Sequence, residues 1–164
     1  NTQPLVTGGG GVTVKYKQVT LSAFFHGRFG QSIVNMARMN NESMFGSNNQ
    51  SKAVLRRWKN EGDNTDIPRA LYNEGRNYLG SDRFVEKASF VRLKSMTLSY
   101  GFPRKICNRF NVNSLSVFVT GYNLFTWTNY TGQDPEVSVK DNLAIDTATT
   151  PVAKRFSFGL NMSF

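Results

Sequence analysis

The ten residues R-F-S-F-G-L-N-M-S-F, positions 155–164, decide the fold class of this chain. Large apolar side chains alternate there with serine, glycine and asparagine; the apolar set is Phe156, Phe158, Leu160, Met162 and Phe164. Because a helix would scatter this period-two pattern around its circumference, the pattern predicts a β-strand with one apolar and one polar face. About ten residues is also the length with which a tilted strand crosses the hydrocarbon core of a bilayer, and about twice the usual strand length in soluble domains.

Four earlier segments alternate in the same way, so the sequence predicts an all-β chain. With the closing strand at about 154–164, the expected strands cover about 6–16, 19–29, 84–102 and 114–128. Only Lys17 and Gln18 separate the first two strands, which predicts a hairpin. The apolar side chains of the third strand change parity near Lys94 and Ser95, which predicts a β-bulge there.

The connections between these strands alternate between short turns and long loops. The long loops, 30–83 and 131–153, exceed the length of ordinary connectors, and loops of that size usually carry function. We expect short helices in the first loop, near Ile33–Met44 and Ala53–Trp58. Short turns on one side and long loops on the other are typical of outer-membrane barrels, whose long loops are extracellular.

Aromatic side chains gather at both ends of the expected strands, as in the girdles of membrane barrels. Up-and-down folding places Tyr16, Tyr100 and Phe102 at the short-turn end, and Trp127 and Tyr130 at the long-loop end. The apolar parity of the strands would then face lipid.

The polar parity of the strands would face the inside of a barrel. His26 and Arg28 lie on this parity, so we expect both to face the lumen. His26 is the only histidine, and it has no second ligand at metal-binding spacing. It is therefore interpreted as an interior polar residue rather than a metal ligand or a catalytic group.

Composition excludes several other classes of protein. No run of 18 apolar residues occurs, so the sequence predicts no transmembrane helix. The net charge is +9, but the only concentrated set of basic residues without acidic neighbours is Arg104, Lys105 and Arg109. This set is too small for a nucleic-acid footprint. The single cysteine, Cys107, rules out an internal disulfide. No signal segment opens the chain, so an exported protein with this sequence would be expected to be longer.

The residues that enzymes and cofactor sites require are missing or wrongly spaced. No carboxylate pair has a spacing that would mark acid–base catalysis. The glycines at 8–11 precede a strand and no Gly-Lys-Ser/Thr follows, which argues against a phosphate-binding loop. Asp63, Asn64 and Asp66 lack the spacing of a calcium loop. The sequence therefore predicts no enzyme activity, no cofactor and no metal.

Several segments resemble the C-terminal end of the SusC/RagA family of TonB-linked outer-membrane transporters. The main ones are F-V-R-L-K-S-M-T-L-S-Y-G-F-P (90–103), L-S-V-F-V-T-G-Y-N-L-F-T-W-T-N-Y-T-G-Q-D-P-E (115–136) and the closing strand. S-A-F-F-H-G-R-F-G (22–30), N-T-D-I-P-R-A (64–70) and S-D-R-F-V (81–85) are similar to that family as well.

The resemblance implies a twenty-two-stranded barrel in the Gram-negative outer membrane. Residues 1–164 would supply its last five antiparallel strands, with long extracellular loops that contain short helices. The plug, the segment that contacts TonB and the other N-terminal parts would lie upstream of this chain.

The resemblance also implies a function and partners. The whole protein would import glycans, peptides or similar nutrients, energised by the TonB complex, with a SusD-like surface lipoprotein as its lid. The outer-membrane assembly machinery would read the strand that ends on Phe164. Candidate contacts with substrate or partner are Trp58, Asp66, Arg69, Tyr72, Asp134 and Glu136, although for each of them an ordinary solvated loop position is the favoured interpretation.

Two alternatives stay open at this point. One is a soluble β-sandwich or barrel that serves as a binding module, and the other is a passive porin-type barrel. In a soluble module Phe156, Leu160 and Phe164 would contact the apolar faces of other strands, whereas in a membrane barrel they would point away from the protein.

Overall fold

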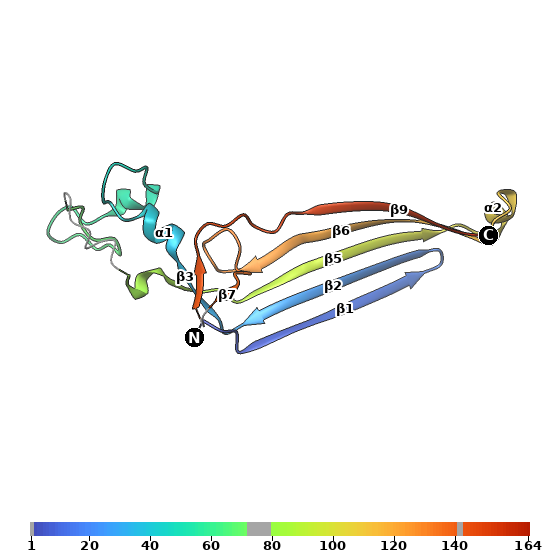
Figure 1. Ribbon diagram of the computed structural model, residues 1–164, viewed down its shortest axis with the longest axis horizontal. Coiled ribbons are helices and arrows are strands. Elements are labelled where there is room, and N and C mark those ends of the chain that lie inside the picture. Colours follow the sequence, from blue (N-terminus) through green and yellow to red (C-terminus); the bar gives the residue numbers. More distant parts are fainter. Residues whose placement is uncertain (1, 72–79, 141–142) are drawn as a thin grey trace. The chain divides into compact units, whose positions relative to one another are not determined.

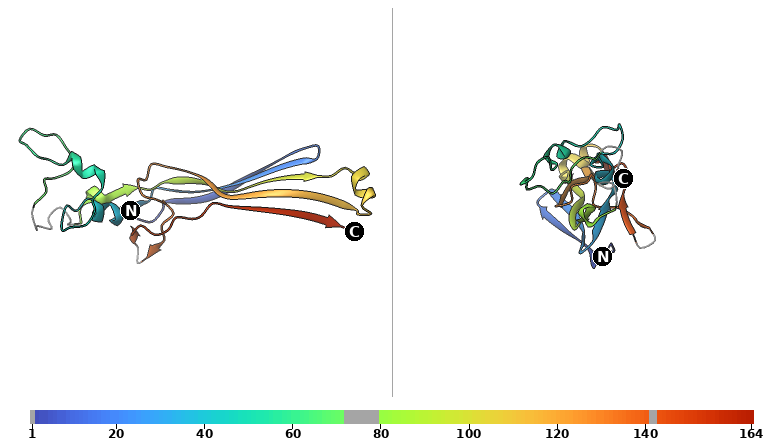
Figure 2. Two further views of the ribbon diagram at one scale, coloured as in Figure 1. Left: turned by 90° about the horizontal axis from the view of Figure 1, so that it is seen from above. Right: turned by 90° about the vertical axis from the view of Figure 1, so that its left-hand side faces the viewer.

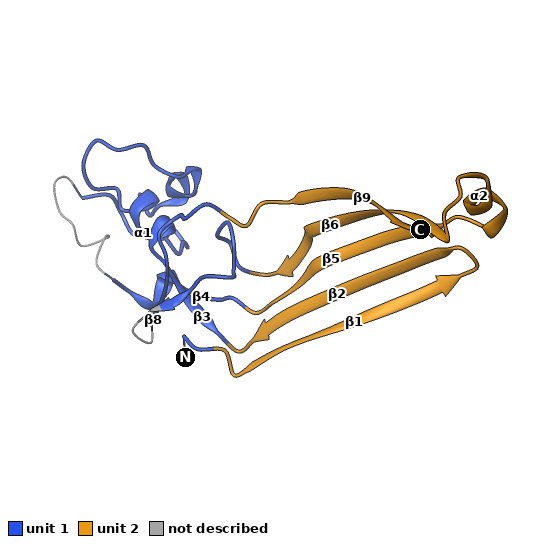
Figure 3. Ribbon diagram, turned by 45° about the vertical axis from the view of Figure 1, so that its right-hand side comes forward, with its two compact units in different colours: residues 1–3, 31–88, 130–150 blue, residues 4–30, 89–129, 151–164 orange. Residues whose placement is uncertain are grey.

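A computed structural model of the chain describes residues 2–71, 80–140 and 143–164. The chain divides into two compact units (Figure 3). The first, here called the loop unit, contains residues 1–3, 31–88 and 130–150. The second, the strand unit, contains residues 4–30, 89–129 and 151–164. The two connections that the sequence suggested were loops therefore belong to one folded unit.

The strand unit is a five-stranded antiparallel sheet with the order β1-β2-β5-β6-β9 (Figure 1). Its strands are β1 (Val6–Tyr16), β2 (Val19–Phe29), β5 (Phe90–Gly101), β6 (Ser114–Thr128) and β9 (Arg155–Ser163). The order in the sheet follows the order in the chain, so the strands form an up-and-down meander, seen from above in Figure 2. Within the described residues, β1 and β9 each have a partner on one side only.

The expected strand at 84–102 is divided between the two units, which corrects the sequence prediction. Its first part is β4 (Val85–Lys87), which belongs to the sheet of the loop unit, and β5 begins at Phe90. Ala88 and Ser89 separate the two strands. The backbone of Ala88 bonds to Gln31 instead of to a strand: its N–H donates to the Gln31 carbonyl at 3.0 Å, and its carbonyl accepts from Gln31 Nε2 at 2.9 Å.

The predicted β-bulge is confirmed at Lys94. Ser95 pairs with Phe24 and Leu93 pairs with Phe25, so Lys94 has no counterpart on β2. The neighbouring strand β6 adjusts at the same level, where Asn123 adopts a positive φ of 53°. The bulge brings the apolar side chains on either side of it to the same face of the sheet.

The two faces of the sheet differ sharply in chemistry. One row of directly paired residues crosses every strand with apolar side chains only: Val14, Leu21, Leu98, Val119 and Phe158. The adjacent row on the opposite face carries only hydroxyl groups: Thr13, Ser22, Thr97, Thr120 and Ser157. Within this row Thr13 bonds to Ser22 at 3.0 Å and Thr97 bonds to Thr120 at 2.9 Å. At this level of the sheet, one face is therefore apolar and the other is polar.

Aromatic rings on the polar face cover glycines of the two edge strands. The ring of Phe24 lies over Gly9 and Gly11 of β1, and the ring of Phe118 lies over Gly159 of β9. Glycine leaves backbone uncovered, and a neighbouring aromatic ring can shield it. The glycines are thus part of the packing between neighbouring strands.

The loop unit has a small mixed sheet of its own, which the sequence did not predict. The order is β4-β3-β8-β7, with β3 (Ser32–Asn35) parallel to β8 (Leu143–Asp146) and β7 (Val139–Lys140) antiparallel to β8. Its core is a cluster of Ile33, Ala88, Tyr130 and Ala144. Because the strands have two to four residues, they show no alternation from which they could be recognised.

Short helices complete both units. The loop unit contains α1 (Met36–Asn41) and the 3₁₀ helices η1 (Lys52–Arg56) and η3 (Asp82–Phe84). The short turn that the sequence predicts between β5 and β6 contains a helix, α2 (Arg104–Arg109). No helix in the described part of the chain is long and apolar enough to span a membrane.

The contact between Phe118 and Gly159 leads to a test. A Cβ atom at Gly159 would collide with the Phe118 ring, whereas one at Gly10 would meet open space. We expect Gly159→Ala to destabilise the strand unit by about 1–3 kcal/mol, as overpacking does, and Gly10→Ala to have no such effect. The measurement is the midpoint temperature of unfolding of each variant, detected by the change in gel mobility between folded and unfolded protein. Equal midpoints for the two variants would contradict the packing described here.

Candidate functional site

The closing strand presents its apolar side chains to the surroundings. Phe158 is 79% exposed and Phe164 is 83% exposed, and Phe156, Leu160 and Met162 are exposed too. In a soluble sandwich such residues would be covered by a second sheet. Within the described residues, the apolar side chains of the closing strand are therefore not covered by a second sheet.

The aromatic residues expected in the girdles fall into two groups. Tyr16 and Tyr100 are exposed at the short-turn end, where the Tyr100 and Phe102 rings meet edge to face at 5.2 Å. At the other end of the sheet Trp127 is exposed and lies 6.1 Å from the Phe125 ring.

Tyr130 does not belong to a girdle, which corrects the sequence prediction. Its side chain is only 6% exposed and lies in the core of the loop unit. Its hydroxyl donates to Asp146 Oδ2 at 2.6 Å. Burial, together with the bond to this carboxylate, raises the pKa of Tyr130 far above its ordinary value. Tyr130 is therefore a structural residue that fastens β8 to the segment after β6.

His26 and Arg28 lie on the polar parity of β2, as the sequence suggested. They pair with Arg92 and Phe90 of β5, respectively. The His26 ring lies 6.0 Å from the Phe90 ring, and its buried Nδ1 atom has no hydrogen-bond partner. Within the described residues no group of His, Cys, Asp and Glu is arranged to hold a metal.

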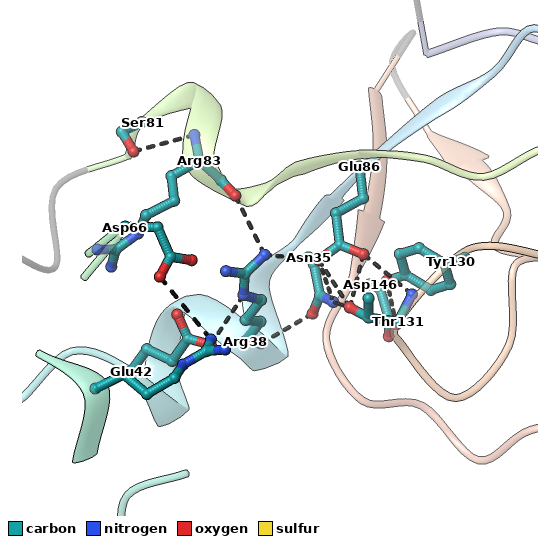
Figure 4. Close-up of polar contacts among 11 residues, drawn as sticks. Asn35, Arg38, Glu42, Asp66, Ser81, Arg83, Glu86, Tyr130, Thr131 and Asp146 are labelled. Carbon is teal, nitrogen blue, oxygen red and sulfur yellow. Dashed lines mark hydrogen bonds and ion pairs between the residues drawn. The ribbon is translucent and has the colours of Figure 1, made fainter. Parts of the chain in front are cut away.

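A cluster of polar contacts around Glu86 binds the loop unit together (Figure 4). The Glu86 carboxylate accepts from the backbone N–H of Thr131 at 3.1 Å and from its hydroxyl at 2.7 Å. It also accepts from Asn35 Nδ2 and Arg38 Nη1, each at 3.2 Å. The cluster thus joins β4, the start of α1 and the segment after β6, which are far apart in the sequence.

Arg38 and Asn35 extend this cluster along α1. Asn35 caps the helix, because its side-chain Oδ1 accepts from the Arg38 N–H at 2.9 Å. The Arg38 guanidinium forms ion pairs with Glu42 at 2.9 Å and with Glu86 at 3.2 Å. A single arginine therefore connects two carboxylates of different segments.

The charge states of the cluster follow from these contacts. Partial burial opposes ionisation of Glu86, but hydrogen bonds from Thr131, Arg38 and Asn35 outweigh it and hold the pKa of Glu86 below its ordinary value. Burial would likewise lower the pKa of Arg38, yet its bonds to Glu42 and Glu86 raise that pKa. Glu86 and Arg38 are accordingly both charged at neutral pH.

An open cleft of about 590 Å³ lies beside this cluster within the loop unit. Amide and hydroxyl side chains contribute much of its wall, among them Asn41, Ser51, Thr131 and Gln133. Arg56 and Asp146 also line it. Because the wall offers both donors and acceptors, the cleft is suited to a polar solute that can form hydrogen bonds in both senses.

Two of the candidate contact residues lie together in a second, smaller cleft. Trp58 and Arg69 line an open volume of about 380 Å³ with Thr65, Ile67 and Pro68. The neighbouring Asp66 is exposed, and its carboxylate lies 3.9 Å from the Arg56 guanidinium.

The other candidates lie elsewhere. The Asp134 carboxylate accepts from the Glu136 N–H at 2.8 Å and so shapes its own loop. Between them, the Pro135 carbonyl accepts from Gln31 Nε2 at 3.1 Å. Tyr72 lies outside the described residues.

The comparisons with known proteins agree with this geometry. No family profile matches the chain. The chain is 30% identical over 159 residues to TonB-dependent receptor P3 of Formosa agariphila, covering 92% of this chain and 15% of the relative. It is 28% identical over 159 residues to TonB-dependent receptor P26 of the same organism, covering 93% and 16%. The chain thus spans about one sixth of the length of these relatives.

Solved structures with the same architecture cover nearly all of the chain. The RagAB peptide importer in its closed-closed state matches 99% of this chain and 18% of its own, with a TM-score of 0.83 and 27% identity. The open-open state of that importer matches with a TM-score of 0.80 and 26% identity. The prediction of a SusC/RagA-type segment from the sequence is confirmed by these comparisons.

The Glu86 cluster generates a prediction about acid. The pKa of Glu86 is lower in the folded state than its ordinary value of 4.5. Ionised Glu86 therefore stabilises the folded loop unit above that pH, and this contribution is lost as the pH falls through the folded-state pKa. We expect Glu86→Gln to lower the free energy of unfolding of the loop unit at neutral pH by about 1 kcal/mol or more. The variant should also lose less of that free energy than the unaltered protein when the pH is lowered. Limited proteolysis of the loops in the full receptor, followed from neutral to acidic pH, measures both effects. Glu61→Gln removes the same charge from an exposed side chain and should change neither.

Proposed function

Because this chain belongs to the SusC/RagA family of TonB-dependent receptors, we propose that it forms part of the wall of an outer-membrane transporter that imports nutrients. The observation that carries the proposal is the apolar row from Val14 to Phe158, opposite the hydroxyl row from Thr13 to Ser157. A bilayer on one side and an aqueous lumen on the other require that arrangement.

We propose that residues 1–164 supply five strands near the C-terminus of a much larger barrel. The edge strands β1 and β9 each leave one side unpaired within the described residues, and unpaired backbone groups are costly in hydrocarbon. The relatives are about six times longer, so the missing neighbours and a plug would come from the rest of the parent protein. The loop unit would then belong to the extracellular side.

Import would be driven by the TonB complex acting on the missing part, with a SusD-like lipoprotein covering the extracellular side. Support comes from the similarity of the chain to the RagAB peptide importer. The larger cleft of the loop unit, whose wall includes hydrogen-bond donors and acceptors, fits the capture of peptides, glycans or similar nutrients. The exposed Phe164 at the end of β9 fits recognition by the outer-membrane assembly machinery.

The two alternatives fit less well. A soluble binding module leaves the exposed apolar face of the strand unit unexplained. A passive porin would not be expected to resemble TonB-dependent receptors, yet the sequence comparison finds that resemblance. We therefore favour active import over both.

A matched pair of substitutions on β9 tests the membrane wall. Phe158 and Ser157 are neighbours in sequence but lie on opposite faces. Phe158→Lys places a charge toward lipid, which near the bilayer midplane costs about 2–4 kcal/mol, and we expect less folded receptor in the outer membrane. Ser157→Lys faces the lumen and should be tolerated. Equal amounts of heat-modifiable receptor from both variants would refute the proposed orientation.

The second cleft can be tested through Trp58. We expect Trp58→Ala to weaken nutrient capture about tenfold, the usual effect of losing an aromatic anchor at a binding site. The measurement is depletion of a defined peptide mixture and, in parallel, an oligosaccharide mixture by cells that display equal amounts of receptor. Leu55→Ala, which truncates an exposed apolar residue nearby, serves as the control. Unchanged depletion by the Trp58 variant would remove this cleft from the substrate path.

A further inference from the structure

The charge of this chain is unevenly divided between its two units. The strand unit contains ten Lys and Arg residues and no Asp or Glu, whereas the loop unit contains ten basic and eleven acidic residues. The excess positive charge of the whole chain therefore belongs to the strand unit. Four of its basic residues lie in the two short turns: Lys17, Arg104, Lys105 and Arg109.

Hydrogen bonds bring the two short turns to one end of the sheet. The Gly101 N–H, at the end of β5, donates to the Gln18 carbonyl of the β1–β2 turn at 2.8 Å. The Phe102 N–H donates to Leu115 of β6 at 2.9 Å, and the Asn113 N–H donates to Ser163 of β9 at 2.7 Å. Figure 3 shows α2 at this end of the strand unit. We call the four basic residues of the two turns the basic rim.

The basic rim is accompanied by exposed apolar side chains. In and after α2, Ile106 is 38% exposed and Phe110 is 65% exposed, while Cys107 and Val112 point into the protein and are buried. All four basic residues of the rim are exposed. Tyr16, Tyr100 and Phe164 are exposed at the same end. Exposed apolar side chains beside cations, without any Asp or Glu, are typical of segments that lie in a membrane interface.

We propose that the basic rim binds the headgroups of anionic phospholipids in the leaflet that faces the short turns. The proposal rests on the membrane placement proposed above. Phosphate groups would pair with Lys17, Arg104, Lys105 and Arg109, while Ile106 and Phe110 would insert among the adjoining acyl chains. The contacts would hold the short-turn end of the wall at a fixed depth in the bilayer.

An acidic soluble protein is the competing occupant for such a surface. Charge alone would suit either one. The lipid is favoured because the exposed apolar residues of α2 continue the aromatic edge formed by Tyr16 and Tyr100, which on the proposed placement already lies at the level of the headgroups.

The test uses the full receptor reconstituted into phosphatidylethanolamine vesicles that contain a minor share of phosphatidylglycerol. Spin-labelled forms of the two lipids report which headgroup is enriched at the protein surface. We expect enrichment of phosphatidylglycerol, falling at least about threefold in the variant Arg104→Ser/Lys105→Ser/Arg109→Ser, since each basic residue near a membrane surface contributes measurably to binding anionic lipid. The control variant Lys52→Ser/Lys59→Ser/Lys87→Ser removes the same charge from exposed positions of the loop unit and should keep the enrichment.

The outcomes separate the rim from the transporter itself. Receptor that inserts into vesicles but keeps its enrichment in the rim variant would overturn the rim proposal and leave the wall intact. Failure of the unaltered receptor to insert would overturn the proposed function. Enrichment of phosphatidylglycerol at the unaltered receptor should also weaken as salt is added, because salt screens the attraction between the rim and the headgroups. Enrichment that does not depend on salt would contradict the proposal, even if the rim variant did not fold. A rim variant that keeps its lipid preference but loses an acidic protein partner would show the rim to be a protein surface.

Discussion

The strand unit depends on the cost of leaving backbone hydrogen bonds unmade where there is no water. In the proposed bilayer, each N–H and C=O of a spanning strand must find its partner on a neighbouring strand. The continuous ladder from β1 through β2, β5 and β6 to β9 meets that need for every interior strand. Once the ladder is fixed, successive side chains have only two environments to enter, and a one-residue slip would exchange them.

The loop unit is held together in another way. Its strands have two to four residues and its apolar cluster is small, so burial alone gives it little cohesion. Charge-assisted hydrogen bonds around Glu86 join segments that the chain brings in separately, and the Tyr130 hydroxyl does the same for β8. Such bonds contribute more per contact than bonds between neutral groups.

The long strands could be predicted from the sequence because their alternation extends over nine to fifteen residues. The same reading placed the bulge at Lys94, since a change of parity leaves a visible mark. β3, β7 and β8 could not be predicted, because segments so short do not establish a period, and for the same reason β4 was not distinguished from the long strand that follows it. Trp127 and Tyr130 look equivalent in the sequence, and only the folded loop unit distinguishes an exposed ring from a buried one.

The candidate site was predicted only in part. The sequence drew attention to Trp58 and Arg69, and the structure places both in one cleft. Glu86, Thr131 and Arg38 were missed because their association depends on pairing across long stretches of chain, which no local pattern records.

The separate core of the loop unit has a consequence for how such proteins diversify. Its packing involves Ile33, Ala88, Tyr130 and Ala144, none of which belongs to the long strands. Mutations that reshape the clefts therefore need not disturb the alternation on which the wall depends. On the proposed function, a change of substrate needs changes only in the two segments that form the loop unit, while the five long strands that carry them stay the same.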